Sequence, residues 1–306
     1  MGKKEDPLIR YEGNPILTPE QMPFRCYSVF NAGAIRFKDE YLLLLRVEDY
    51  SRRTDFYVAT SKDGINFSVR SEPINYPLTE IEKRYRKGHR FDMRITYLEN
   101  TYYVCHALWL DPGCMIAMAK TEDFVNFEPL PYTSVPSNRN AVLFPEKING
   151  LYARLERPQN IDGSGIMWVS YSPDLVYWGK SMPLDIPVTP WSGKKIGAGT
   201  VPIKTREGWL EIYHGVGGTC STENYYLGVA LLDLDDPSRV IAAPRECILA
   251  AEKEYECIGQ VPNVVFTCGA IETDDGKLNI YYGGADTRIC LAQTTIDTLI
   301  DYCLKR

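Results

Sequence analysis

The stretch RFDMRITYLENTYYVCH at residues 90–106 shows the local pattern that decides the fold. Residues 91–97 are typical of a β-strand, residues 98–100 of a polar turn, and residues 101–106 of a second strand rich in Tyr. The same order of strand, turn and strand recurs along the chain. Its five copies cover residues 30–46, 91–106, 141–157, 198–214 and 264–283. The second strands begin at residues 41, 101, 151, 209 and 278, so each step is between 50 and 69 residues.

A second repeated motif supports this division. It occurs as SKDGINF at 61–67, TEDFVNF at 121–127 and SPDLVYW at 172–178. Each copy places an aromatic residue three or four positions after an Asp. The pattern predicts a tight turn between outer strands, held by a buried ring.

Five copies of a four-stranded unit, with no helical period between them, indicate radial repetition. We therefore expect an all-β fold, a five-bladed β-propeller, with a β-sandwich or two small β domains as the alternatives. Only residues 294–306 have helical spacing of their apolar residues, which predicts a short C-terminal helix. No linker or low-complexity stretch interrupts the chain, so residues 1–306 are expected to form a single domain.

Composition narrows the class of protein. The 306 residues carry a net charge of −6, which argues against general nucleic-acid binding, because that requires a basic face. The nine cysteines are an odd number without a CxxC pair and are typical of reduced thiols in a cytoplasmic protein. The first residues lack the apolar segment of a signal peptide, and the apolar run at 42–45 is too short to span a membrane.

Asp92 stands between Arg90 and Arg94 in the opening stretch. A carboxylate held between two cations tends to stay ionised. Asp92 is therefore either part of a structural ion pair at a strand end, or it shares its arginines with an anionic substrate.

In a propeller, the first strand of each blade lines the central channel, where ligands bind. Polar residues of the first strands and of the ends of the second strands should converge there. They are Asn31, Arg46, Glu48, Asp92, Arg94, His106, Arg139, Asn140, Arg157, Lys195, His214 and Asp286. An inward-facing group of cations is costly unless it binds an anion. The pattern predicts an oxyanion pocket, most simply for phosphate, with separate ion pairs to Glu146, Glu156 and Glu211 as the alternative.

Other chemistry is not indicated. The three histidines lack carboxylates at ligand spacing, so no metal site is expected. The chain contains no P-loop, no GxGxxG after a strand and no GxSxG, so no nucleotide-binding or nucleophile motif is present. The basic run at 82–90 is interpreted as a solvated loop rather than a nucleic-acid patch.

Eight motifs lie in register across the five repeats. They are VFNAG at 29–33, LRVED at 45–49, FDMRI at 91–95, RNAVLFPEKI at 139–148, RP at 157–158, KIGAG at 195–199, IYHGV at 212–216 and YYGGADT at 281–287. Together they resemble glycoside hydrolase family 130, the β-mannoside phosphorylases, from about residue 12 to residue 300. That family is a five-bladed propeller, which agrees with the repeat count.

The resemblance implies an activity. Members cleave β-mannosidic bonds with inorganic phosphate, invert the anomeric centre and release α-mannose 1-phosphate. We therefore expect a phosphorylase of β-1,4- or β-1,2-linked manno-oligosaccharides or mannosyl-glucose disaccharides, with phosphate as co-substrate and no cofactor. A hydrolase of the same family and a non-catalytic glycan-binding propeller are the alternatives. The oligomeric state is left open, a homo-oligomer included.

The resemblance also implies a role for each matching residue. Asp92 matches the catalytic general acid, whose proton is thought to pass through the O3 hydroxyl of the mannose. The phosphate-binding positions are matched by Arg139, Asn140, Arg157, Lys195 and His214. The mannose subsite is matched by Asn31, Arg46, Glu48, Arg94 and Asp286, with Glu48 in place of the Asp that many members have.

One motif departs from the family pattern. The family usually has Tyr-Asp-Pro-Arg or Glu-Asp-Pro-Arg where this chain has FDMR at 91–94. Met93 in place of Pro frees the backbone before Arg94, and Phe91 lacks the hydroxyl of a Tyr. Both stand beside Asp92, so we expect them to affect specificity and rate rather than mechanism.

Overall fold

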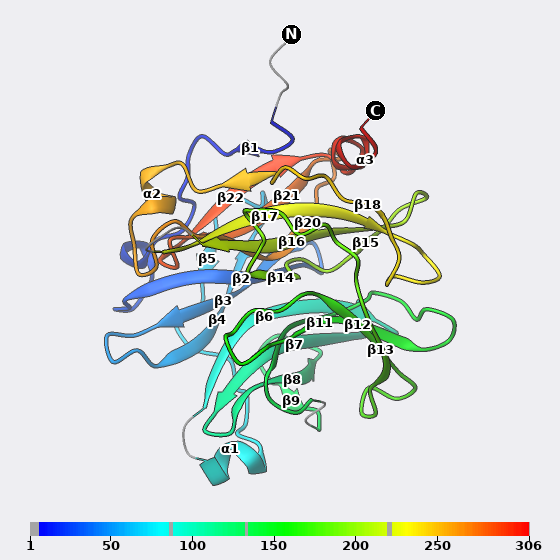
Figure 1. The fold of residues 1–306 in the computed structure, drawn as a ribbon. Helices are drawn as coiled ribbons and strands as arrows, with labels where there is room; N and C mark the ends of the chain where they lie inside the picture. Colours follow the sequence, from blue (N-terminus) through cyan, green and yellow to red (C-terminus); the bar gives the residue numbers. More distant parts are fainter. Residues whose placement is uncertain (1–5, 86–87, 132–133, 219–221, 306) are drawn as a thin grey trace.

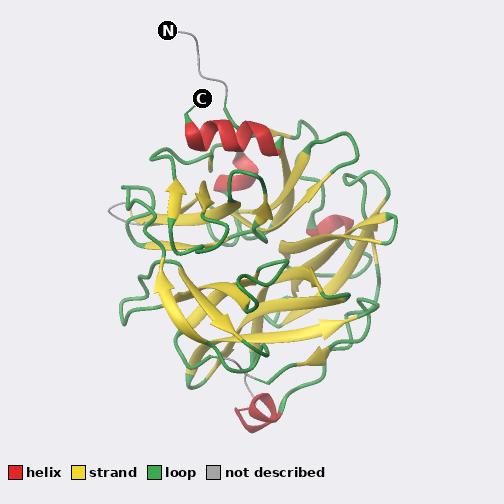
Figure 2. Ribbon diagram, turned by 90° about the vertical axis from the view of Figure 1, so that its right-hand side faces the viewer, coloured by secondary structure: helices red, strands yellow, loops and turns green. Residues whose placement is uncertain are grey.

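The computed structural model describes residues 6–85, 88–131, 134–218 and 222–305. They form a mostly β structure with few helices, as the repeats predict (Figures 1 and 2). The helical segments are α1 (Glu80–Tyr85), α2 (Glu254–Cys257), α3 (Ile296–Leu304) and a 3₁₀ turn at Pro19–Gln21.

The described strands divide into five antiparallel units that follow one another along the chain. The first unit contains β2 (Ser28–Phe37), β3 (Glu40–Glu48), β4 (Thr54–Ser61) and β5 (Ser68–Val69). The second contains β6 (His89–Leu98), β7 (Thr101–Leu110), β8 (Gly113–Thr121) and β9 (Glu128–Pro129). The third contains β10 (Asn138–Leu143), β11 (Tyr152–Pro158), β12 (Trp168–Ser172) and β13 (Gly179–Pro183).

The last two units carry additions to the same plan. The fourth contains β14 (Lys195–Ala198), β16 (Trp209–Gly218), β17 (Glu223–Leu232) and β18 (Val240–Ala242), with β15 (Ile203–Lys204) on β16 and β19 (Leu249–Ala250) on β17. The fifth contains β20 (Val265–Glu272), β21 (Leu278–Gly284), β22 (Arg288–Thr294) and the N-terminal β1 (Ile9–Arg10). A parallel bridge between β2 and β20 joins the first and fifth units into one eight-stranded sheet.

The packing of β3 explains why residues 42–45 are all Leu. Successive side chains of a strand point to opposite faces. Leu43 and Leu45 pack with residues of β21 and β22, whereas Leu42 and Leu44 pack with residues of β6. The first unit is therefore covered on both faces by its neighbours, and a strand buried on both sides is apolar throughout.

The three predicted tight turns are confirmed. Asp63 Oδ1 accepts hydrogen bonds from the backbone N–H groups of Ile65 and Asn66 at 2.9 and 2.8 Å. Asp123 and Asp174 accept the same pair of bonds in their own turns. An Asp that binds the backbone two residues further on favours this geometry, which is why the motif repeats.

Two parts of the sequence prediction were wrong. The copy at 198–214 was expected to begin with one continuous strand before the turn that precedes residue 209, but β14 ends at Ala198 and β15 begins at Ile203. Pro202 lies between them and has no N–H to donate to a ladder. The basic run at 82–90 was expected to be a loop throughout, but it begins inside α1 and ends in β6.

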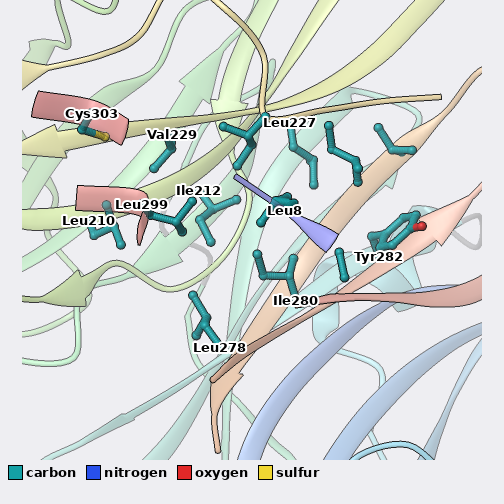
Figure 3. Packing of buried hydrophobic residues seen from close by; sticks show 14 of the residues in the cluster. Leu8, Leu210, Ile212, Leu227, Val229, Leu278, Ile280, Tyr282, Leu299 and Cys303 are labelled. Atoms are coloured by element: carbon teal, nitrogen blue, oxygen red, sulfur yellow. The ribbon is translucent and has the colours of Figure 1, made fainter. Parts of the chain in front are cut away.

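The C-terminal helix α3 is confirmed. The side chain of Thr295 accepts a hydrogen bond from the backbone N–H of Thr298 at 3.1 Å and so caps its start. Leu299 and Cys303 are buried in a cluster with side chains of β16, β17 and β21 (Figure 3). None of the described helices is long and apolar enough to cross a membrane.

A partly buried ion pair joins the N-terminal strand β1 to the helix α2. β1 runs antiparallel to β22, and Arg10 Nε donates to Glu256 Oε1 at 2.8 Å. Glu256 is fully buried, and its oxygens also accept from the Tyr282 hydroxyl and from two backbone N–H groups. Burial alone would raise the pKa of Glu256, but these donors outweigh it and hold the pKa below its ordinary value.

We expect Glu256→Gln to lower the free energy of unfolding by about 3 kcal/mol, because it leaves the Arg10 guanidinium without its buried counter-ion. Urea unfolding followed by circular dichroism measures this change. Glu252→Gln is the matched control: Glu252 also faces Arg10, at 3.4 Å, but its side chain is 66% exposed. That variant should lose less than about 1 kcal/mol, and equal losses in the two variants would contradict the account.

Candidate active site

A cavity of about 240 Å³ lies among the first strands of the units. Eight of the residues predicted from the sequence line it. They are Asn31, Arg46, Asp92, Arg139, Asn140, Arg157, His214 and Asp286. These residues come from all five units, so the predicted convergence is found.

The same backbone irregularity delivers three of these side chains. β2, β6 and β10 each have a break in their pairing register, between Phe30 and Gly33, between Phe91 and Arg94, and between Arg139 and Val142. Such a break is a β-bulge, which re-aims side chains next to functional sites.

Each bulge contains a residue in the left-handed region. The φ angles of Asn31, Asp92 and Asn140 are 48°, 54° and 54°. Asn and Asp tolerate this conformation better than other residues with a Cβ. The repeated Asn or Asp at this position is therefore required by the backbone as well as by the cavity that it lines.

Asp92 is held by two neighbours from the first unit. Arg46 Nη1 and Asn31 Nδ2 each donate to Asp92 Oδ1 at 3.0 Å. Burial alone would raise the pKa of Asp92, but Arg46, Arg94 and the bond from Asn31 outweigh it, so the pKa lies below its ordinary value. Asp92 is a carboxylate in the unliganded site.

The expected placement of Asp92 between Arg90 and Arg94 was wrong. Arg90 Nε and Nη2 donate to Glu82 at 2.8 and 2.9 Å, which keeps that guanidinium with α1. Arg94 donates to the backbone carbonyl of Asp92 rather than to its carboxylate. Residues 90, 92 and 94 would share one face of a regular strand, but the bulge between Phe91 and Arg94 breaks that alternation, so closeness in sequence did not imply contact.

Phe91 and Met93, the two departures from the family motif, have different surroundings. The Arg46 guanidinium lies 4.5 Å from the Phe91 ring centroid and 4.3 Å from that of Phe30. Phe91 therefore lines the cavity and orients Arg46 through its ring face. Met93 is fully buried in the cluster with Leu42 and does not line the cavity.

Asp286 is the second carboxyl group of the cavity. Burial raises its pKa to about 7; Arg46 opposes the rise, and the charges of Asp92 and Glu48 add to it. Asp92 and Asp286 thus share one cation, and below about pH 7 the pair holds one proton, on Asp286.

Arg157 is the buried cation of the opposite wall. Its side chain is 2% exposed, and its Nε and Nη2 donate to Asn140 Oδ1 at 3.2 and 2.9 Å. Its Nη1 has no hydrogen-bond partner among the described residues. Burial and the nearby Arg139 lower the pKa of Arg157 to about 10.

The alternative of separate ion pairs does not hold for this wall. Within the described part of the chain, neither Arg139 nor Arg157 pairs with a carboxylate. The three glutamates proposed as partners are occupied elsewhere: Glu156 by Arg154, Glu146 by Lys204, and Glu211 by the backbone N–H of Gly199. Arg139 Nε instead donates to the Gln159 side chain at 3.0 Å.

Four of the twelve residues predicted to converge do not line the cavity. His106 is 1% exposed, and its Nε2 lies 2.9 Å from the Tyr76 hydroxyl. Lys195 pairs with Glu223 at 2.6 Å, and its Nζ lies 5.8 Å from the ring centroid of Tyr225, which does line the cavity. Glu48 is 4% exposed and lies behind Arg46, to which it is bonded at 2.6 Å. Arg94 is 1% exposed and donates only to backbone carbonyls.

Sequence reasoning missed the apolar part of the wall. It consists of Ala107, Trp109, Tyr225, Val261, Val264 and Phe266, together with Phe91. Trp109 is 49% exposed at the end of β7, and the Arg139 guanidinium lies 5.5 Å from its ring centroid. One feature of the sequence could have predicted this wall: Trp109 lies at the end of a second strand, two residues after Ala107, and two residues apart in a strand means the same face. Aromatic faces of this kind suit sugar rings.

Comparison with known proteins gives a consistent result. The model for glycoside hydrolase family 130, described as beta-1,4-mannooligosaccharide phosphorylase, matches residues 5–305. The chain is 37% identical to a beta-1,4-mannooligosaccharide phosphorylase of Ruminococcus albus, over 97% of this chain and 91% of that protein. It is 38% identical to a 4-O-beta-D-mannosyl-D-glucose phosphorylase of Bacteroides fragilis, over 90% and 75%. The structure of a beta-1,2-mannobiose phosphorylase from Listeria innocua, in complex with beta-1,2-mannobiose, has a TM-score of 0.88 and 30% identity, over 98% and 99% of the two chains.

Asp286→Asn should stabilise the protein in alkaline solution. Because the pKa of Asp286 is about 7 in the folded protein, above the ordinary 3.8, its contribution to stability is present at low pH and is lost as the pH rises through about 7. Removing the ionisable group should raise the free energy of unfolding at pH 8 by on the order of 2 kcal/mol, with a smaller gain toward pH 4.5.

Chemical unfolding of wild type and variant at both pH values measures the difference. Asp274→Asn, at a carboxyl group that is 89% exposed, is the control and should leave the pH profile unchanged. An Asp286→Asn protein that is less stable than wild type at pH 8 would contradict the assignment.

Proposed function

This chain belongs to glycoside hydrolase family 130, and we propose that it is a phosphorylase that cleaves β-mannosides with inorganic phosphate and releases α-D-mannose 1-phosphate. Its substrates are β-1,4- or β-1,2-linked manno-oligosaccharides or mannosyl-glucose disaccharides, the classes on which its relatives are named as acting.

The observation that carries this proposal is the free Nη1 of Arg157, which is buried in the same cavity as the Asp92 carboxylate. A buried guanidinium with an unused donor is costly, and a phosphate oxygen matches the donor in charge and geometry. A tetrahedral anion in contact with Arg157 and His214 would face Asp92 and Arg46 across the space that a sugar ring fills.

The distribution of charge distinguishes phosphorolysis from hydrolysis. An inverting hydrolase uses one carboxyl group as acid and a second, on the other side of the sugar, to activate water. Here both carboxyl groups of the cavity, Asp92 and Asp286, interact with Arg46, and among the described residues the wall with Arg139 and Arg157 contributes no carboxylate. Phosphate is already an anion and needs no base, so cations that position it are sufficient.

The roles that we propose are those that the family resemblance implies. Arg139, Asn140, Arg157 and His214 bind phosphate, with Lys195 adding positive charge. Asn31, Arg46 and Asp286 bind the mannose, while Glu48 and Arg94 support them from behind. Asp92 transfers the proton to the departing oxygen, through the O3 hydroxyl of the mannose.

The protons balance without a further reactant. Hydrogen phosphate brings one proton, and the departing sugar leaves with one on its new hydroxyl group. Asp92 is ionised in the free site, so its proton arrives with the ligands or from Asp286, which keeps its own up to about pH 7. Mannose that displaces water from Asp92 raises the affinity of that carboxylate for the proton.

We further propose that the five antiparallel units are the blades of one propeller formed by residues 1–306, with the cavity at its axis. The contacts of β2 with both β6 and β20 support closure of the ring. The eight described cysteines are free, which supports a cytoplasmic location.

Release of mannose 1-phosphate tests the activity. Incubation with phosphate and a panel of β-1,4-mannobiose, β-1,2-mannobiose and β-mannosyl-glucose should release mannose 1-phosphate from at least one of them, detected by phosphorus NMR. Omission of phosphate should stop cleavage, because the cavity has no second carboxyl group placed to activate water. Release of free mannose at the same rate without phosphate would establish the hydrolase instead, and saturable sugar binding without turnover the non-catalytic module.

Asp92→Asn should lower kcat by about 10²- to 10⁴-fold, because the amide cannot transfer the proton. Its KM for the mannoside should change less, since Arg46 and Asn31 remain. The control is Asp274→Asn, the same substitution at an exposed carboxyl group beside Arg36. Turnover of Asp92→Asn within threefold of wild type would exclude the assigned role.

A further inference from the structure

Two buried histidines of this chain bind a backbone carbonyl through Nδ1. In His106, Nδ1 lies 3.1 Å from the carbonyl oxygen of Ala107, and Nε2 lies 2.9 Å from the hydroxyl of Tyr76. A carbonyl oxygen can only accept, so Nδ1 carries the ring proton and Nε2 accepts the O–H of Tyr76. Burial, followed by the charge of Arg90, lowers the pKa of His106 to about 4, so the ring stays neutral.

His214 repeats this arrangement at the cavity. Its Nδ1 lies 3.2 Å from the carbonyl oxygen of Ala198, so Nδ1 carries the proton and Nε2 carries the lone pair. The ring is 1% exposed. Burial, then the charges of Arg157 and Arg94, hold the pKa of His214 well below its ordinary value, so the ring is neutral. For His214, no Tyr hydroxyl of the described chain occupies the position that Tyr76 takes at His106.

His214 Nε2 and the guanidinium of Arg157 lie close to each other, both next to Gly197. A Cβ on Gly197 would lie 3.0 Å from both His214 Nε2 and Arg157 Nε. Only a glycine at 197 leaves room for the two groups to approach this closely. Both residues line the cavity, so an anion bound by Arg157 is adjacent to an acceptor as well as to donors.

Arg94 fixes the carbonyl on which this depends. Its Nη2 donates to Ala198 O at 2.9 Å and its Nε to Gly199 O at 2.8 Å, both in buried positions. Its Nη1 donates to Asp92 O at 2.9 Å. Arg94 thus holds the end of β14 against the bulge that carries Asp92, and Glu211 holds the N–H of Gly199 from the other side.

From this geometry we propose that His214 accepts a hydrogen bond from the bound anion, so that the site selects a tetrahedral oxyanion carrying an O–H group, and that Arg94 is the positioning residue that keeps His214 in this state. The proposal rests on the proposed phosphorolysis, since it concerns the same phosphate site. It names the protonated form of the co-substrate, hydrogen phosphate, as the one that is bound.

Sulfate separates this proposal from simple charge attraction. Near pH 8, sulfate and hydrogen phosphate are both tetrahedral dianions of similar size, but only hydrogen phosphate carries an O–H. A sulfate oxygen would face the lone pair of Nε2 without a proton between them, which leaves a buried acceptor unsatisfied. Hydrogen arsenate carries the O–H and should behave as phosphate does.

Isothermal titration of the whole protein with sodium phosphate, arsenate and sulfate at pH 8 is the direct test. Phosphate and arsenate should bind with similar affinity, and sulfate about 10- to 100-fold more weakly. Sulfate binding within threefold of phosphate would overturn the proposal while leaving phosphorolysis intact. Binding of none of the three would instead remove the phosphate site, and with it the proposed function.

Two variants test the roles of His214 and Arg94. In His214→Gln the side-chain amide supplies an N–H, so the preference for phosphate over sulfate should fall below about threefold. Arg94→Lys keeps the charge, but a Lys cannot donate to the carbonyls of Ala198 and Gly199 together. This variant should therefore bind phosphate more weakly and show a smaller ratio of phosphate to sulfate affinity. A purely structural role would lower the amount of active protein without changing the ratio.

Arg154→Lys is the matched control for Arg94→Lys. Arg154 is also a buried strand arginine, but it pairs with Glu156 at 2.7 Å and does not line the cavity. It should leave the ratio of phosphate to sulfate affinity at the wild-type value. An Arg94→Lys protein with an unchanged ratio would exclude the positioning role, and if that variant does not fold, the ratio in His214→Gln still decides the role of the histidine.

Discussion

The site depends on a buried cation that has no counter-ion of its own. Arg157 is 2% exposed, and within the described chain its guanidinium donates hydrogen bonds only to the amide oxygen of Asn140. Burying such a charge costs several kcal/mol, and its pKa of about 10 reflects that cost. An anion that enters the cavity offsets it. In the function proposed above, binding of phosphate supplies the counter-ion that the protein alone does not provide, and a nucleophile with its own charge takes the place of a second catalytic carboxylate.

The backbone supplies the geometry through repetition. Three first strands carry the same β-bulge, and each bulge places an Asn or Asp with positive φ at the cavity. Asn31 and Asp92 then bond to each other, and Asn140 bonds to Arg157. Asp92 and Asn140 thus occupy equivalent positions of successive units, and Arg94 links Asp92 to the fourth unit through its carbonyl contacts.

Sequence reasoning succeeded where the information was local or periodic. The repeat of strand, turn and strand located the antiparallel units, the Asp turns were recognised from their motif, and the spacing of residues 296–303 predicted α3. It failed where a partner is distant in sequence. Asp92 pairs with Arg46 of another unit rather than with its neighbours, and Lys195 is paired with Glu223. The side chain of Arg94 points where it does because of a bulge, and a pattern of residue types does not reveal a bulge. The apolar wall around Trp109 was missed because the search for site residues followed polar and charged side chains.

A crystal structure of the protein with inorganic phosphate tests the central claim most directly. The account predicts one phosphate in the cavity, with oxygens at hydrogen-bond distance, about 2.7–3.2 Å, from Arg157 Nη1 and from His214 Nε2, and facing Asp92 across an open space. A cavity that remains free of anion at saturating phosphate, or a phosphate bound away from Arg157, would contradict it.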